Sequence, residues 1–425
     1  MATSVNSKLQ QAVTDLADKR AELLVALVRC PSLLGQEGDA QRLMAERLVD
    51  LGLEVDVWEP DVDEVRRHPA FCAYPGFEEL GYRDRPMVVG RLAGAGGGRS
   101  LILQGHMDVV SAEPRAAWAH DPWGGEQVDG KVYGRGSADM KGGLVAALSA
   151  VEALVASGIR PRGDVLIQSV IDEEAYSNGA LACALRGYRA DAAIVGEPTG
   201  MEVIAAHAGV SHFRITVEGR SAHPAHKTEG VCAIEKSMLV YRALMDLEAD
   251  RRARVRHPLF PNGSPVEIVV GTMHAGSWRS SVAGEAVLET RLGFAPGETI
   301  EQVQAELVER LRVVSHADPW LRDHPLGLER IGYTASADLP IEHPFVGVVR
   351  GVARAGGLGE IELQGHGAGN DMQSLIHHAQ TPAIVWGPGA SDAAHVANEF
   401  VELADVERAT RLYAETIAAW CGLAT

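Results

Sequence analysis

The stretch Ser100–Asp108, SLILQGHMD, decides the expected fold because it joins an apolar strand to a histidine and an aspartate. Its residues Leu101, Ile102 and Leu103 form a short apolar run that is typical of a buried strand. Further strands are expected at 164–171 and 192–195, with helices at 141–157 and 178–187 between them. This alternation predicts an α/β fold, a mixed sheet flanked by helices.

The residues before Ser100 predict further elements of the same α/β fold. Apolar side chains at helical spacing indicate helices at 7–29 and 39–51. Residues 60–86 are rich in Pro, Asp, Arg and aromatics and are expected to form an excursion on the surface. The glycines at 94–98 predict a hairpin between a strand at 87–92 and the opening stretch.

The pattern changes after residue 206 and returns near residue 340. Between these positions the order is strand, long helix, two strands and helix, which indicates a compact α+β insert. We therefore expect a catalytic domain formed by residues 1–206 and 329–425, with a smaller domain inserted at 207–328. A chain of 425 residues is long enough for two such domains.

Composition excludes several classes of function. The formal net charge of −18 argues against a nucleic-acid partner, whose phosphates such a surface would repel. Five scattered cysteines without a C-x-x-C pair favour a reducing compartment over a disulfide framework. Neither a signal-peptide pattern nor an apolar run long enough for a membrane span is evident. The expected location is the cytoplasm, with no membrane partner.

Polar residues follow each predicted strand, where α/β proteins gather functional groups. His106 suits a zinc ion, and Asp108 is placed to accept the other ring N–H, although a single histidine is more often an ordinary polar residue. Asp139 precedes a helix, where it is either an N-cap or a carboxylate shared by two metals. Glu173 and Glu174 follow the strand at 164–171, either as part of an acidic turn or beside a cation.

Two more candidates complete the set. Glu197 follows the strand at 192–195, and His395 follows a strand near the C-terminus. Two histidines and three carboxylates, one of them bridging, provide ligands for two four-coordinate zinc ions together with a water or hydroxide. Cobalt and manganese also suit such mixed nitrogen and oxygen ligands. The sequence therefore predicts two divalent metal ions, with zinc preferred.

These segments resemble the family of acetylornithine deacetylase, succinyl-diaminopimelate desuccinylase, aminoacylase and glutamate carboxypeptidase. The resemblance rests on the motifs GHMD at 105–108, ADMKG at 138–142, DEE at 172–174, GEPT at 196–199 and HVANE at 395–399. It implies a zinc-peptidase-like catalytic domain with an inserted dimerisation domain. One metal would be held by His106, Asp139 and Glu197. The other would be held by Asp139, Glu174 and His395, with Glu173 as general base and Asp108 orienting His106.

The resemblance extends to the insert. His223 looks like the family histidine that helps to hold the oxyanion, in dimeric relatives at the partner subunit's site, and the alternative is an ordinary surface histidine. Arg291 looks like the family arginine that binds a substrate carboxylate, and the alternative is a surface salt bridge. Ser280 stands where many relatives have Asn, so a substrate contact is lost or replaced there. Asn370 and Asp371 are expected near the substrate.

The predicted enzyme is a cytoplasmic, homodimeric dinuclear zinc amidohydrolase. It is expected to act on a small N-acyl amino acid as acetylornithine deacetylase does, with metal-activated water as nucleophile. Two alternatives stay open: a dipeptidase or carboxypeptidase, and a deformylase or deacylase of another amine such as a formylaminopyrimidine. A non-catalytic binding protein is disfavoured because the expected general base, Glu173, is present and the set of expected metal ligands is complete.

Overall fold

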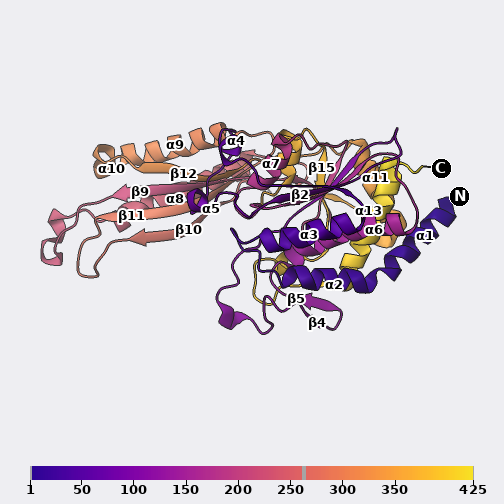
Figure 1. Cartoon of the computed structure of the whole chain (residues 1–425). Helices are drawn as coiled ribbons and strands as arrows, with labels where there is room; N and C mark the ends of the chain where they lie inside the picture. Colours follow the sequence, from indigo (N-terminus) through magenta and orange to yellow (C-terminus); the bar gives the residue numbers. More distant parts are fainter. Residues whose placement is uncertain (1, 261–264, 425) are drawn as a thin grey trace. The chain divides into compact units, whose positions relative to one another are not determined.

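The computed structural model describes residues 2–260 and 265–424, which form two compact units (Figure 1). The first unit contains Met1–Ala205, Leu339–Gln364 and Asn370–Thr425. The second contains Ala206–Asp338 and Gly365–Gly369. It extends beyond the insert predicted at 207–328 to residue 338, and it takes in the separate segment 365–369.

The core of the first unit is a mixed sheet. Its main strands are β1 (Glu54–Trp58), β2 (Met87–Leu92), β3 (Leu101–His106), β6 (Val165–Val170), β7 (Ala193–Val195), β8 (Val203–His207) and β15 (Ala383–Val385). They lie in the order β1-β2-β6-β3-β7-β15-β8. The central strands β6, β3, β7 and β15 are parallel, while β1, β2 and β8 pair with their neighbours in the antiparallel sense. This arrangement confirms the predicted α/β class.

Helices surround this sheet. They are α1 (Ala2–Asp15), α2 (Ala17–Val28), α3 (Gly38–Asp50), α4 (Val62–Arg66), α5 (Phe77–Leu80), α6 (Gly142–Ala156), α7 (Asn178–Leu185), α11 (Pro344–Ala353), α12 (Met372–His377) and α13 (Leu403–Cys421). Helix α6 packs against β3 and against α1, α2 and α13, which explains why its sequence is apolar on nearly all sides. Helix α3 packs on β2, and α7 packs against α12.

Shorter elements complete the unit. They are a three-stranded sheet of β4 (Glu126–Val128), β5 (Lys131–Tyr133) and β16 (Phe400–Glu402), and the helical turns η1 (Arg115–Ala117), η2 (Ser137–Lys141), η4 (Arg354–Leu358) and η5 (Ser391–Ala393). Two further short strands, β13 (Ala337–Asp338) and β14 (Leu363–His366), lie where the chain passes from one unit to the other.

The hairpin predicted at the glycines 94–98 is wrong. Strands β2 and β3 do not pair, because β6 lies between them and bonds to both. The glycines instead let this segment approach the backbone that precedes β6. A Cβ atom on Gly94 would lie 2.4 Å from the carbonyl oxygen of Arg162, and one on Gly98 would lie 2.3 Å from the backbone nitrogen of Gly163.

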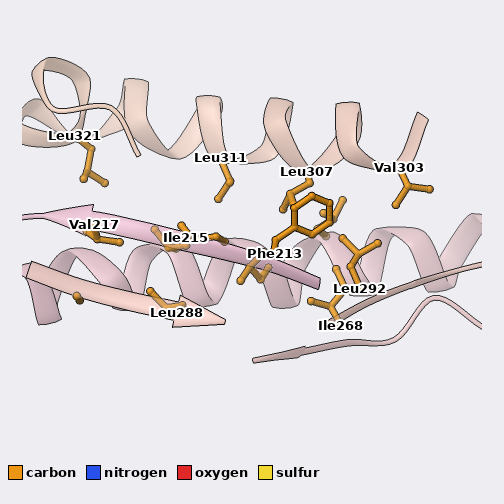
Figure 2. Packing of buried hydrophobic residues seen from close by; sticks show 14 of the residues in the cluster. Phe213, Ile215, Val217, Ile268, Leu288, Leu292, Val303, Leu307, Leu311 and Leu321 are labelled. Carbon is orange, nitrogen blue, oxygen red and sulfur yellow. The ribbon is translucent and has the colours of Figure 1, made fainter. Parts of the chain in front are cut away.

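The second unit is a two-layer α+β structure. Its elements are β9 (Gly209–Glu218), η3 (Pro224–Glu229), α8 (Ala233–Arg254), β10 (Ile268–Ala275), β11 (Glu285–Phe294), α9 (Ile300–Ala317), α10 (Pro319–Asp323) and β12 (Gly327–Thr334). The strands form an antiparallel sheet in the order β10-β11-β9-β12. Side chains alternate along β9, so that Phe213, Ile215 and Val217 are buried on one face. Figure 2 shows Leu307 and Leu311 of α9 facing this apolar layer.

None of the helices in the described parts of the chain combines the length and apolar character that crossing a membrane requires.

Candidate metal centre

The parallel strands of the first unit bring the candidate ligands to one edge of the sheet. His106 is the last residue of β3, and Glu173 and Glu174 follow the end of β6. Glu197 follows β7, and His395 lies ten residues beyond β15. Because β3, β6, β7 and β15 run in the same direction, their carboxyl ends meet at the same edge.

Asp139 lies between the two histidines. Its Oδ1 is 3.2 Å from Nε2 of His106, and its Oδ2 is 3.3 Å from Nε2 of His395. Glu174 Oε1 is 2.9 Å from the same nitrogen of His395, and Glu197 Oε2 is 3.7 Å from Nε2 of His106. One carboxylate oxygen therefore faces each histidine, which is the arrangement of a carboxylate that bridges two cations.

The electrostatics of this cluster reflect closely spaced acids. Burial raises the pKa of Glu173 well above its ordinary range, and the neighbouring Glu197 raises it further. Burial also raises the pKa of Glu197 to about 8, against the opposing effect of His106. Burial lowers the pKa of His106, but Glu197 and Asp139 outweigh it and hold that pKa well above its usual value. Without cations, the cluster retains protons that metal ions would displace.

The donor set fits divalent metals. His106, Glu173 and Glu197 bring one ligand atom each within 4.8 Å of one another, and so do His106, Asp139 and Glu174. Oε1 of Glu197 is buried and has no hydrogen-bond partner among the described residues, so it offers a lone pair that nothing else uses. Imidazole nitrogen and carboxylate oxygen are ligands for zinc, cobalt and manganese. The residues therefore fit a divalent metal centre at this edge.

Asp108 supports His106 through a different atom from the one expected. The backbone carbonyl oxygen of Asp108 is 2.8 Å from Nδ1 of His106, whereas its carboxylate is 3.7 Å away. A carbonyl can only accept, so Nδ1 carries a proton, and in the neutral ring Nε2 is the nitrogen whose lone pair faces the site. The Asp108 carboxylate instead accepts the backbone N–H of Glu174 at 3.0 Å. Asp108 therefore supports two candidate ligands, His106 through its carbonyl and Glu174 through its carboxylate.

Glu399 and Lys141 hold the segment that carries Asp139, and sequence reasoning assigned neither of them a role. One oxygen of buried Glu399 accepts the backbone N–H groups of Ala138 and Asp139, both at 3.0 Å, and the other accepts Arg135 Nη1 at 2.6 Å. Buried Lys141 donates to two backbone carbonyl oxygens at and beyond the end of α2. The available signal was their position within the motifs HVANE and ADMKG.

Asn370 and Asp371 have different surroundings. The Asn370 side chain accepts the backbone N–H of Met372, the first residue of α12, at 3.0 Å. Asp371 is fully buried, and burial raises its pKa to about 7 against the opposing effects of His106 and Ser177. Its charge also raises the pKa of Glu173 and Glu197. The structure therefore places Asp371 beside the cluster, whereas the Asn370 side chain has a local backbone partner.

The remaining predicted residues belong to the second unit. Nδ1 of exposed His223 accepts the backbone N–H of Ala225 at 3.2 Å, so the neutral ring carries its proton on Nε2 as an available donor. Arg291 donates to the backbone carbonyl of Gly367, and burial lowers its pKa. Ser280 lies in the exposed turn between β10 and β11.

Comparison with known proteins relates this chain to characterised enzymes. The sequence model of peptidase family M20/M25/M40 matches residues 102–419. The chain is 30% identical over 435 residues to N-formyl-4-amino-5-aminomethyl-2-methylpyrimidine deformylase of Halalkalibacterium halodurans, which covers 96% of each protein. It is 29% identical over 409 residues to acetylornithine deacetylase of Yersinia pestis, which covers 94% of this chain and 97% of the relative.

Solved structures share the fold at lower identity. The dipeptidase Dug1p from Saccharomyces cerevisiae aligns with a TM-score of 0.78 and 14% identity over 99% of both chains. Human carnosine dipeptidase 1 aligns with a TM-score of 0.72 and 16% identity over 98% of this chain and 99% of that chain. Because the family model spans most of the sequence and a relative at 30% identity covers nearly all of it, the chain belongs to peptidase family M20/M25/M40, whose members are metal-dependent hydrolases of amide and peptide bonds.

Proposed function

We propose that the chain hydrolyses the amide bond of a small N-acylated amine, with Glu173 as general base. The observation that carries this proposal is Asp139, whose two carboxylate oxygens each face a different histidine. His106, Asp139 and Glu197 would hold one divalent ion, and Asp139, Glu174 and His395 the other. Bound zinc, or cobalt or manganese in its place, would activate a water and polarise the scissile carbonyl.

The residues of the chain supply the proton transfers. Glu173 has Oε2 3.9 Å from Nε2 of His106, so its carboxylate lies at the edge of the cluster beside the reacting centre. In the proposed reaction it takes a proton from the attacking water and delivers that proton to the leaving nitrogen. His223 would donate its Nε2–H to the developing oxyanion, from the partner subunit of a homodimer.

A formylated aminomethylpyrimidine is the first substrate class that we propose. Two relatives named as deformylases of this class are 30% and 28% identical to the chain, and the matches cover 96% and 98% of it. Ser280, which stands where many relatives have Asn, leaves room for this choice. The reaction would release formate and the free amine.

An N-acyl amino acid is the second candidate because of Arg291. Its guanidinium forms no ion pair with a carboxylate anywhere in 2–260 or 265–424, so its donors beyond the Gly367 carbonyl stay available for a substrate carboxylate. The acetylornithine deacetylase relatives, 29% identical over 94% of the chain, support the same reading.

A substrate panel separates these candidates. Purified protein, with its metal content determined, is offered a formylaminopyrimidine, N-formyl, N-acetyl and N-succinyl amino acids, and simple dipeptides. We expect the formylaminopyrimidine to give the highest kcat/KM. Preference for one N-acyl amino acid would move the assignment to deacylase, and cleavage of dipeptides alone would move it to peptidase. Metal binding without turnover on any compound would contradict the proposed substrate classes.

We also assign the protein to the cytoplasm. None of the five cysteines, all of which lie within the described residues, forms a disulfide, and this is usual in a reducing compartment. Expression of a tagged chain followed by cell fractionation tests the assignment, and recovery of the protein outside the cytoplasmic fraction would contradict it.

A further inference from the structure

Residues 60–86, expected as a surface excursion, form a small folded segment with its own apolar centre. The ring of Phe77 lies 5.0 Å from that of Phe71, 5.2 Å from that of Tyr74 and 5.7 Å from that of Tyr82. Phe77, Tyr74 and Tyr82 are buried. The segment is therefore packed in one conformation, and it can hold the residues that bind to it in fixed positions.

Arg85, near the end of this segment, uses all five of its N–H donors inside the protein. Nε and one N–H of Nη2 bind the two carboxylate oxygens of Glu37, at 2.8 and 2.6 Å. The other N–H of Nη2 binds Asp172. Nη1 donates to the Tyr74 hydroxyl at 2.9 Å and to the Gly81 carbonyl at 2.7 Å. Arg85, Glu37 and Asp172 are each at most 1% exposed, so these bonds are shielded from water.

The Asp172 carboxylate anchors the loop that carries Glu173. It accepts the Tyr74 hydroxyl at 3.1 Å as well as Arg85. Asp172, Tyr176 and Ser177 have φ values of 62°, 74° and 62°, a region that residues other than glycine occupy only when their surroundings hold them there. A second anchor follows at once, because the backbone N–H of Glu174 donates to Asp108. Glu173 is the residue between the two anchors.

A third contact joins the same two segments further along. The Asn178 side chain accepts the backbone N–H of Cys72 at 3.2 Å and donates to the Cys72 carbonyl at 2.9 Å. Asn178 begins α7, directly after the loop 172–177. The 60–86 segment is therefore hydrogen-bonded to both ends of this loop, through Asp172 at its start and Asn178 directly after it.

We propose that Arg85 is a positioning residue for the general base, acting on Glu173 through Asp172. The inference rests on the proposed role of Glu173. Arg85 joins α3, the 60–86 segment and the loop by charged hydrogen bonds, since Glu37 is the N-cap of α3 and Asp172 starts the loop. Lysine offers three donors in place of five and lacks the planar fork, so it cannot satisfy all these partners.

The first readout is hydrogen exchange, which requires no turnover. In the full chain, both zinc-loaded and metal-free, Arg85→Met is expected to speed exchange of the Glu174 and Ser177 amides about tenfold or more, because their bonds depend on the loop geometry. The matched control is Arg20→Met, which removes another buried arginine with a carboxylate partner, Glu407, on a different helix. It is expected to leave exchange of these two amides unchanged.

The second readout is the division between kcat and KM on the panel substrate that the unaltered protein cleaves fastest. Arg85→Met is expected to lower kcat about 10²-fold by misplacing the base, with KM within about threefold and zinc content unchanged. Arg85→Lys is expected to recover part of the loss. Tyr74→Phe, which removes one hydroxyl, provides a milder variant of the same kind should Arg85→Met fail to fold, with a smaller fall in kcat.

Equal behaviour of the Arg85 and Arg20 variants in both readouts would overturn the inference. So would a fall in zinc content that accounts for the whole loss of kcat. Glu173→Gln, measured in parallel, distinguishes failure of the proposed general base from failure of the positioning role of Arg85. Full activity in that variant would overturn both. An inactive Glu173→Gln with unaffected Arg85 variants would overturn the positioning inference alone.

Discussion

Glu173 and Glu174 are adjacent in the chain but face different parts of the centre. Glu174 lies 2.9 Å from His395, whereas the nearest imidazole to Glu173 is that of His106 at 3.9 Å. Consecutive residues on a loop point in different directions, so one carboxylate can bind a cation while its neighbour handles protons. This division of roles makes the two glutamates separable by mutation.

Replacing Glu173 with Gln is expected to lower kcat by about 10²-fold or more, because the amide keeps the shape of the side chain but accepts no proton. Metal content is expected to stay at about two ions per chain, since Glu173 lies outside the proposed ligand set. Metal analysis and steady-state kinetics on the same sample check both statements. Glu22→Gln, on the exposed side of α2, is the control. Full activity in Glu173→Gln would refute the mechanism.

Sequence reasoning found residues whose role follows from their type and their place at a strand end, such as His106 and Glu197. It attributed the support of His106 to the carboxylate of Asp108, although the backbone carbonyl makes that bond. Residue identity does not show which oxygen of an aspartate points inward. Arg85 was missed because charge and proline in its segment indicate exposure, while the aromatic residues nearby were the sign of packing.

At the level of elements, the centre depends on a close approach between α6 and the segment after β7. A Cβ atom on Gly143 would lie 2.0 Å from the carbonyl oxygen of Gly196, the residue before Glu197. Only glycine allows this contact, because any larger residue must push the helix or the Glu197 segment away. The helix position therefore helps to set the position of a proposed ligand.

Gly143→Ala is expected to destabilise the protein by about 1–3 kcal/mol through overpacking. It is also expected to weaken metal binding, because the shift reaches Glu197. Gly351→Ala is the matched control at an exposed position of α11, where a Cβ atom meets nothing within 4 Å. That change is expected to be neutral or to stabilise by about 0.5–1 kcal/mol. Thermal unfolding and metal titration of both variants test this, and identical behaviour of the two would contradict it.

Most elements could be predicted because each occupies one contiguous periodic segment. The strand expected at 164–171 and the helix expected at 141–157 match β6 and α6 closely. The hairpin at 94–98 was wrong because pairing depends on β6, which lies about seventy residues further along the chain. The helix predicted at 7–29 is broken between Asp15 and Ala17, where no glycine or proline marks the break.

At the scale of the whole molecule, the acidic centre makes the stability of the metal-free protein depend on pH. Hydrogen bonds to Asp139 and Glu174 raise the pKa of His395 to about 10, and burial raises that of Glu197 to about 8. Both folded-state values exceed the ordinary values of 6.5 for His and 4.5 for Glu. The folded metal-free protein therefore binds protons that the unfolded chain has released, and this stabilisation is lost as pH rises.

The Tm of chelator-treated protein is accordingly expected to fall by roughly 5 °C between pH 7 and pH 9. The Tm of zinc-loaded protein is expected to fall less than this or to rise, because cations replace the bound protons and bind more tightly as pH rises. Thermal unfolding across this range with and without zinc provides the measurement. A metal-free Tm that rises with pH would show that the carboxylates are not protonated in the folded state.

The second unit carries an exposed apolar face suited to self-association. Ile234, Met238 and Tyr241 lie on one side of α8, exposed by 45%, 41% and 37%. Val269 and Met273 of the edge strand β10 are also exposed. We expect a homodimer in sedimentation, as proposed from the family resemblance, and Met238→Glu is expected to shift it toward monomer. Val313→Glu, at another exposed apolar position, on α9, is the control. A strictly monomeric and fully active protein would contradict a role for His223 across subunits.

We propose that two metal ions at the edge of the mixed sheet of the first unit enable amide hydrolysis. The most direct test removes the metal with a chelator and then adds zinc back in steps. At each step, the rate of hydrolysis of a formylaminopyrimidine and of N-acetylornithine is measured together with the number of metal ions bound per chain. We expect activity to vanish on removal and to return as occupancy approaches about two ions per chain. Hydrolysis that persists in metal-free protein, or a chain that binds no metal under any loading condition, would contradict the account.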